Sequence, residues 1–118
     1  MNKVLIVDDD PLFREALCTM LQGFEVTQAT EGSAAARAFR RMPDAIVLCD
    51  IFMEGKEGLE TIRDLRQAYP EAKIIAMSSE GTSTGIDVLD FASQQGADLT
   101  LRKPFDKAQL LEAIAKIA

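Results

Sequence analysis

The fold is decided near the start of the chain by the stretch VLIVDDDP, residues 4–11. Its four consecutive apolar residues, rich in β-branched side chains, indicate a strand that is buried on both faces. The pair Asp10-Pro11 is typical of a helix start, with aspartate at the N-cap and proline at the first helical position. A buried strand that leads directly into a helix predicts a βα unit of a parallel sheet.

The same alternation continues along the chain of 118 residues. The expected strands are 4–7, 24–29, 45–49, 73–77 and 99–101. The expected helices are one from Pro11 to a stop at Gly23, with Phe13, Leu17, Met20 and Leu21 on its inner face, and then 33–41, 58–68, 86–95 and 107–117. Five strands alternating with five helices predict a doubly wound α/β fold, in which helices cover both faces of a parallel sheet through right-handed crossovers.

Length and composition narrow the function classes. The length supports one compact domain, which we expect to span residues 1–118. The net charge of -6 argues against direct binding to nucleic acid or to an anionic membrane. The first apolar run is too short for a signal peptide or a membrane span. Two cysteines, Cys18 and Cys49, do not make a disulfide framework and favour a reducing, cytoplasmic setting. The absence of histidine excludes a histidine base, metal ligand or phosphate carrier.

Polar side chains follow the expected strands at the edge where doubly wound sheets bind their ligands. They are Asp8, Asp9 and Asp10 after the first strand, Asp50 after the third, Ser78 after the fourth and Lys103 after the fifth. Each has an ordinary explanation when taken alone, as a helix cap, a turn residue or a solvated charge. Together they are a different matter, because clustered carboxylates repel one another and favour a bound cation.

The chemistry of this set points to magnesium and phosphate. Mg²⁺ prefers oxygen ligands, whereas a site for zinc or copper would need imidazoles or neighbouring thiols. The Lys103 ammonium and the Ser78 hydroxyl are suited to phosphoryl oxygens. The set therefore contains a nucleophile, ligands for a metal ion and a group that neutralises charge, which are the parts that phosphoryl transfer requires.

From end to end, the chain resembles the CheY-like receiver domains of response regulators. The resemblance lies in VLIVDDD, IVLCD, AMSS and LRKPF, which occur in this order, together with Gly58. It implies the flavodoxin-like (βα)₅ fold with the five strands in the order 2-1-3-4-5. It also implies a signalling domain of a two-component or phosphorelay system, which is not a conventional enzyme although it catalyses its own phosphorylation and dephosphorylation.

The resemblance assigns roles to the residues that match. Asp50 would be the phosphoacceptor, assisted by Ser78 and Lys103. Asp8, Asp9, Asp50 and the backbone carbonyl of Phe52 would bind Mg²⁺, with Asp8 acting mainly through water. The Lys103-Pro104 bond is expected to be cis.

Partners are also implied by the resemblance. The phosphoryl group would come from a sensor histidine kinase or a histidine phosphotransfer protein. Phosphorylation would change the surface of the fourth helix, fifth strand and fifth helix. That surface would engage a downstream output domain or protein, and a phosphorylation-dependent homodimer would use the same surface.

Three positions depart from the usual pattern or refine it. Thr100 stands where the family usually has an aromatic residue that turns inward with the switch. Glu54 stands where a proline is common. Phe52, two residues past the acceptor, is hypothesised to shield the phosphate and to slow its loss; the alternative is that it only packs the loop.

Three other functions stay open at the level of sequence. In a haloacid-dehalogenase-type phosphatase, Asp8 would be the nucleophile and Asp10 the acid, but no late acidic pair follows Lys103. A flavodoxin-like FMN binder needs a hydroxyl-rich and glycine-rich loop where this chain has three acids. A pseudo-receiver would bind partners without phosphorylation, and the changes at Thr100 and Glu54 keep that alternative open.

Overall fold

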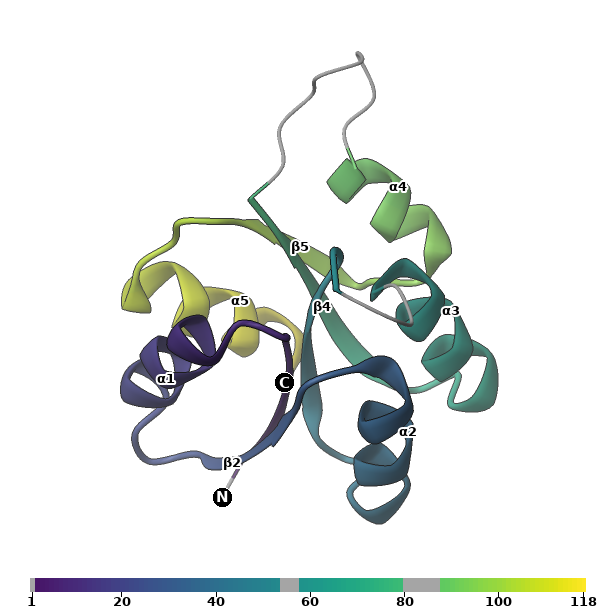
Figure 1. The fold of residues 1–118 in the computed structure, drawn as a ribbon, viewed down its shortest axis with the longest axis horizontal. Helices are drawn as coiled ribbons and strands as arrows, with labels where there is room; N and C mark the ends of the chain where they lie inside the picture. Colours follow the sequence, from purple (N-terminus) through teal and green to yellow (C-terminus); the bar gives the residue numbers. More distant parts are fainter. Residues whose placement is uncertain (1, 54–57, 80–87) are drawn as a thin grey trace.

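The chain forms one parallel sheet covered by helices on both faces (Figure 1). The computed structural model describes residues 2–53, 58–79 and 88–118. The strands are β1 Lys3–Val7, β2 Glu25–Ala29, β3 Ile46–Asp50, β4 Lys73–Ser78 and β5 Leu99–Arg102. The helices are α1 Pro11–Met20, α2 Gly32–Arg41, α3 Gly58–Ala68, α4 Val88–Gln95 and α5 Lys107–Ile117. The strand order β2-β1-β3-β4-β5 confirms the expected fold.

The expected strands differ from the observed ones by one residue at some of their ends. β3 includes Asp50 and β4 includes Ser78, whereas the sequence pattern places both residues just after their strands. The reason is pairing, because Asp50 is in register with Met77 and Ser78 is in register with Arg102. The helices α3 and α5 have the expected bounds. The expected start of the fourth helix, at residues 86 and 87, lies outside the described residues.

Alternating side chains of the central strands build two cores. On one face, Leu5, Val47 and Ile74 pack beneath α2, α3 and α4. On the other face, Ile6 and Leu48 pack beneath α1 and α5 (Figure 1). All five of these side chains are fully buried. Because both faces of the central strands are covered, their apolar runs are continuous rather than alternating.

Helix α1 begins as the sequence indicates. Asp10 is its N-cap, and the carboxylate accepts a hydrogen bond from the backbone N–H of Leu12 at 3.0 Å. Pro11 is the first helical residue. At the other end, Gly23 has a φ of +95°, a conformation that favours glycine and turns the chain toward β2.

A charged cluster lies at the amino-terminal ends of β4 and β5, and we call it the Arg66 cluster. Arg66, on α3, forms an ion pair with Asp98 in which Nη2 and Oδ2 are 2.6 Å apart. The same guanidinium donates hydrogen bonds to the backbone carbonyls of Gly96, Pro70 and Ala72. Asp98 Oδ2 also accepts the backbone N–H of Ile74 at 2.8 Å. Arg66 therefore joins α3 to the segments that follow α4 and precede β4.

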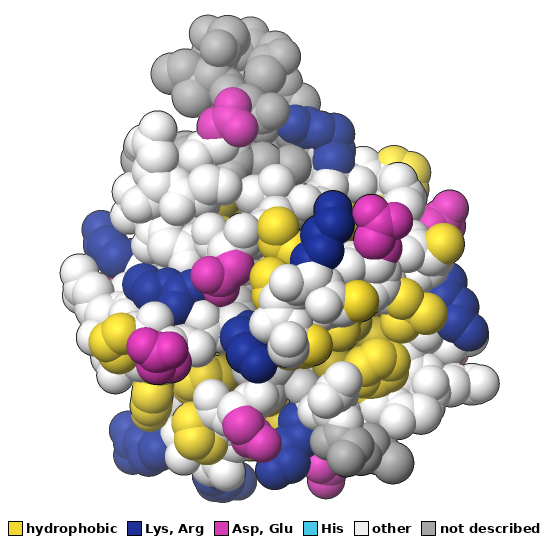
Figure 2. Space-filling view, turned by 180° about the vertical axis from the view of Figure 1, so that it is seen from behind, with side chains coloured by type: hydrophobic (Ala, Val, Ile, Leu, Met, Phe, Trp, Pro, Cys, Tyr) yellow, Lys and Arg dark blue, Asp and Glu magenta, His cyan; other side chains and the backbone are white. Residues whose placement is uncertain are grey.

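The face of the molecule opposite to the view of Figure 1 carries charges of both signs. Figure 2 shows Lys and Arg side chains interspersed with Asp and Glu on that face. Apolar side chains gather mainly in the half where α1 and α5 lie. Among the described residues, no helix is both long enough and apolar enough to cross a membrane.

Candidate functional site

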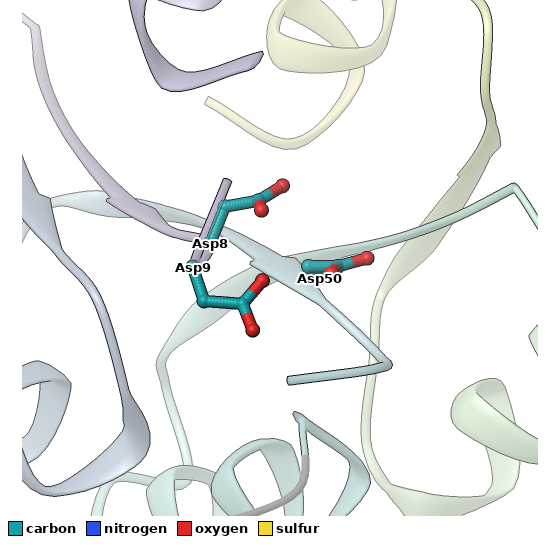
Figure 3. A group of neighbouring side chains, drawn as sticks. All are labelled: Asp8, Asp9 and Asp50. Atoms are coloured by element: carbon teal, nitrogen blue, oxygen red, sulfur yellow. The ribbon is translucent and has the colours of Figure 1, made fainter. Parts of the chain in front are cut away.

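Three carboxylates meet at the carboxyl-terminal edge of the sheet. Asp8 and Asp9 directly follow β1, and Asp50 ends β3. The two strands are neighbours, with Val7 in register with Cys49. One oxygen atom from each carboxylate lies within 4.8 Å of the other two. Figure 3 shows the three side chains reaching from these two strand ends toward the same space.

Asp8 is the most constrained of the three. Its side chain is fully buried, and Oδ1 accepts the backbone N–H of Asp10 at 2.9 Å. Arg14 of α1 donates from Nη1 to the Asp8 backbone carbonyl at 2.8 Å. Asp9, by contrast, is exposed. Asp10 caps α1 as the sequence indicates, so the third acid of the triplet has a structural role.

Lys103 reaches this group from the end of β5. Its Nζ lies 3.0 Å from Asp8 Oδ2 and 3.4 Å from Asp50 Oδ1. Its backbone N–H donates to the Ser78 carbonyl at 2.9 Å, which ties the segment after β5 to β4. The Lys103-Pro104 peptide bond is cis, as the resemblance implies. We call Asp8, Asp9, Asp50 and Lys103 the acidic rim.

The acidic rim has more negative than positive groups, and this affects Asp50. Burial raises the pKa of Asp50 from 3.8 to about 6. The Lys103 ammonium works against this increase, whereas the charges of Asp8 and Asp9 add to it. The carboxylate of Asp50 would therefore be favoured by any further positive charge placed among these side chains.

Two other expected site residues, Ser78 and Phe52, lie at or just beyond the ends of β4 and β3. Ser78 is fully buried at the end of β4, one residue beyond Met77, the partner of Asp50 in the sheet. Phe52 follows β3 with 49% of its surface exposed. Thr100 is half-buried on β5. Glu54 lies outside the described residues.

Gly58 packs directly against the backbone of Asp50 and Ile51. Its backbone N–H donates to the Ile51 carbonyl at 2.9 Å at the start of α3. A Cβ atom at this position would lie 1.9 Å from the Asp50 carbonyl oxygen and 2.6 Å from Ile51 Cα. Only glycine allows so close an approach of the two backbones. The neighbouring Cys49 is buried, and burial raises the pKa of its thiol, which remains protonated and unreactive.

The residues of the rim fit a hard divalent cation. All three side chains offer carboxylate oxygens at a spacing that one ion could bridge. Mg²⁺ is commonly held by one or two carboxylates together with water and phosphate oxygens, so the donor set suits it. Zinc or copper would need nitrogen or sulfur ligands. The buried thiol of Cys49 does not supply one, because it stays protonated.

One contact at the site was missed at the level of sequence. Phe13 was assigned only to the inner face of the first helix, and it does pack in the core beneath α1. Its ring also lies under the Lys103 ammonium, with Nζ 4.0 Å from the ring centroid. The sequence signal that could have indicated this contact is the position of Phe13 in the first turn of α1, at the same edge of the sheet as Asp8, Asp9 and Asp10.

The comparisons with known proteins all match the chain to the same family over nearly its full length. The family model described as "Response regulator receiver domain" matches residues 4–115. The chemotaxis protein CheY of Thermotoga maritima is 32% identical over 120 residues, which cover 99% of this chain and 98% of CheY. The solved structure of CheY4 from Vibrio cholerae has a TM-score of 0.88 and 27% identity, and it covers 100% of this chain and 99% of that one.

Other relatives are longer than this chain. The nitrate/nitrite response regulator NarP of Escherichia coli is 36% identical over 116 residues, which are 95% of this chain and 53% of NarP. The response regulator FleR of Pseudomonas aeruginosa is 33% identical, and this chain spans 24% of its length. The match therefore covers the whole of some relatives and about half or less of others.

Proposed function

The chain belongs to the family of response regulator receiver domains, and from this we propose that residues 1–118 act as a single domain that takes a phosphoryl group on Asp50. The observation that best supports this role is the contact of Asp50 with Lys103, 3.4 Å away, beside the carboxylates of Asp8 and Asp9. A nucleophile, a cation and ligands for a metal ion at one edge of the sheet are what phosphoryl transfer requires, and this supports the proposal.

The transfer itself is a simple exchange of bonds. A carboxylate oxygen of Asp50 attacks the phosphorus of a phosphohistidine on a sensor kinase or a phosphotransfer protein. The new O–P bond forms as the P–N bond breaks, and its electron pair stays on the imidazole nitrogen of the partner. This chain has no histidine, so the donor histidine must belong to another chain or to a segment outside this sequence.

The residues of the acidic rim, together with Phe52 and Ser78, have distinct roles in this proposal. Lys103, already paired with Asp50, offsets the charge of the incoming phosphoryl oxygens. Asp8, Asp9, Asp50 and the Phe52 carbonyl would hold Mg²⁺. When bound, Mg²⁺ would neutralise part of the negative charge shared by the carboxylates and the phosphoryl group. The hydroxyl of Ser78 would donate to a phosphoryl oxygen.

Signalling follows from the charge that phosphorylation adds. An acyl phosphate brings about -1.5 to -2 charges to a rim that is already acidic. We propose that the surface of α4, β5 and α5 responds and binds an output domain or protein, or a second copy of this chain. Thr100 lies on this surface and lines a pocket of about 230 Å³ with Leu99, Leu101 and residues of α5. To reverse a strongly inactive equilibrium, phosphate must favour the active state by about 5 kcal/mol.

The cellular setting completes the proposal. Cys18 and Cys49 are free thiols in the structure, and Cys49 is buried. Free thiols suit a reducing compartment, so we propose that the protein acts in the cytoplasm.

Intact-mass analysis after incubation with acetyl phosphate tests the acceptor directly. Wild type should gain one phosphoryl group when Mg²⁺ is present and little when EDTA replaces it. Asp50→Asn should gain none, because the amide is a poor nucleophile. The matched control is Asp44→Asn, which should behave as wild type. It alters an exposed carboxylate that precedes β3 and pairs with Lys3 at the start of β1, at the opposite end of the sheet from the rim.

Two other outcomes would contradict the proposal. An adduct that persists in Asp50→Asn would move the acceptor to Asp8 or another acid. If wild type gains no mass from acetyl phosphate or from a phosphorylated histidine phosphotransfer protein, the pseudo-receiver alternative would replace the proposed function.

A further inference from the structure

The Lys103 ammonium has an aromatic neighbour that the proposed function does not use. Its Nζ contacts Asp8 Oδ2 at 3.0 Å and Asp50 Oδ1 at 3.4 Å, and it lies 4.0 Å from the centroid of the Phe13 ring. A cation this close to a ring face is attracted by the negative charge of the π system. Two carboxylates and one ring therefore share the same ammonium.

The ring is held in place by a second aromatic residue. Phe13 and Phe105 make an edge contact, with centroids 5.8 Å apart and ring planes at 88°. Phe105 is buried and follows the Lys103-Pro104 bond directly. The aromatic pair thus connects the first turn of α1 to the segment that carries Lys103, and the near-perpendicular arrangement is a favourable one.

The environment strengthens the contact between the cation and the ring. The Lys103 side chain is only 15% exposed, and its carboxylate partner Asp8 is fully buried. Attraction between a cation and a ring is greatest where water is excluded. A lysine side chain also has many rotamers, so a fixed ring beneath its ammonium reduces the number of positions that it can take.

We propose that Phe13 is a positioning residue, whose ring holds the Lys103 ammonium at the carboxylate that accepts the phosphoryl group. The inference rests on the proposed function of Asp50, but it concerns a residue on a different element. Phe13 does not touch the reacting atoms; it acts through Lys103. A leucine would retain most of the packing beneath α1, but it would lose the attraction for the ammonium.

Three variants separate positioning from packing. Phe13→Leu should lower the rate of phosphorylation by acetyl phosphate about threefold to tenfold, the range expected for a partly desolvated cation–ring contact. Phe13→Tyr retains the ring and should restore most of the rate. Phe24→Leu is the matched control, because Phe24 packs against the same core and follows the other end of α1. It should leave the rate unchanged.

A spectroscopic readout tests the contact without any phosphate. In wild type, the ring current of Phe13 should shift the NMR signals of the Lys103 ε-methylene protons upfield. The shift should disappear in Phe13→Leu, persist in Phe13→Tyr and persist in Phe24→Leu. If Phe13→Leu is poorly folded, Phe13→Met, with a flexible side chain that fills gaps, can take its place.

The outcomes distinguish this inference from the proposed function. If wild type forms no adduct, the function of Asp50 is wrong, and the NMR shifts still decide whether the ring holds Lys103. The positioning role is overturned if Phe13→Leu keeps the wild-type rate and the wild-type Lys103 signals. It is also overturned if Phe13→Leu, Phe13→Tyr and Phe24→Leu slow the reaction equally, because the cause would then be packing.

Discussion

The acidic rim and the Arg66 cluster stand at opposite ends of the same sheet, and they differ in their ratio of acid to base. The rim contains three carboxylates and one ammonium, which pairs with two of them. In the Arg66 cluster, one guanidinium faces one carboxylate and three backbone carbonyls. The first set is short of positive charge, whereas the second is balanced.

The difference shows how similar chemistry serves two purposes. A balanced ion pair with directed hydrogen bonds fixes the segments that it joins and leaves little to attract a ligand. An unbalanced group of carboxylates stores unfavourable electrostatic energy, which a cation relieves when it binds. The comparison predicts that removal of charge has opposite effects on stability at the two ends.

The largest effect is expected for Asp50→Asn in metal-free protein. Burial raises the pKa of Asp50 from 3.8 to about 6, so its charged form destabilises the folded state. At pH 7, the variant should be more stable than wild type by about 3 kcal/mol, which corresponds to a pKa difference of about two units. Urea unfolding in EDTA measures the difference.

The gain in stability of Asp50→Asn should depend on pH. The gain should be full above pH 6, shrink as the pH falls from 6 toward 3.8, and vanish below 3.8, where wild type also carries a proton on Asp50. Addition of Mg²⁺ should stabilise wild type more than the variant. A variant that is less stable than wild type at pH 7 would show that the rim is not strained by its charge.

Arg66→Met should have a smaller effect of the opposite sign. The unfolding free energy should fall by about 2 kcal/mol, because Asp98 and the carbonyls lose a shared donor. The rate of phosphorylation by acetyl phosphate should stay within about twofold of the wild-type rate, since the cluster lies at the far end of the sheet. Urea unfolding and intact-mass kinetics on the same samples measure the two quantities.

Arg63→Met is the control for this change, because Arg63 is an exposed arginine on the same helix. It should cost less than about 0.5 kcal/mol. Equal losses in the two variants would mean that the Arg66 bonds add nothing beyond a surface charge.

The smallest effect on stability is expected for a change at Phe52, two residues after Asp50. We predict that Phe52→Asn shortens the lifetime of the acyl phosphate several-fold without a change in stability. A half-exposed ring next to the acceptor strand can exclude the attacking water, whereas an amide can hold it. Decay of the phosphorylated mass after removal of acetyl phosphate gives the lifetime.

Leu12→Asn is the matched control for Phe52, because Leu12 is also a large apolar side chain that is well exposed. Its lifetime should equal that of wild type. An unchanged or longer lifetime in Phe52→Asn would reduce Phe52 to a packing residue of the loop.

Much of the fold could be predicted because burial leaves a clear pattern. The runs 4–7 and 45–49 correspond to β1 and β3, two of the inner strands whose faces are both covered, and each prediction is correct to within a residue. The strand order came from the resemblance to a family, since periodicity alone does not say which strands are neighbours. The exact ends of β3 and β4 depend on pairing with the next strand, which no local pattern contains.

The candidate site was predicted in its members but not in its contacts. Asp8, Asp50 and Lys103 could be named because they follow strands that end at one edge of the sheet. The ring of Phe13 beneath Lys103 could not, since 90 positions separate the two residues and Phe13 fits the core pattern equally well. The ion pair between Arg66 and Asp98 could not be predicted either, because 32 positions separate the two residues and no local pattern pairs them.

The close approach at Gly58 also has an evolutionary consequence. A side chain at this position would collide with the backbone of Asp50 and Ile51 whether or not the domain is phosphorylated. A gene copy that lost its acidic residues would still need this glycine in order to fold. In a lineage that abandons phosphorylation, we therefore expect this glycine to be retained longer than the carboxylates.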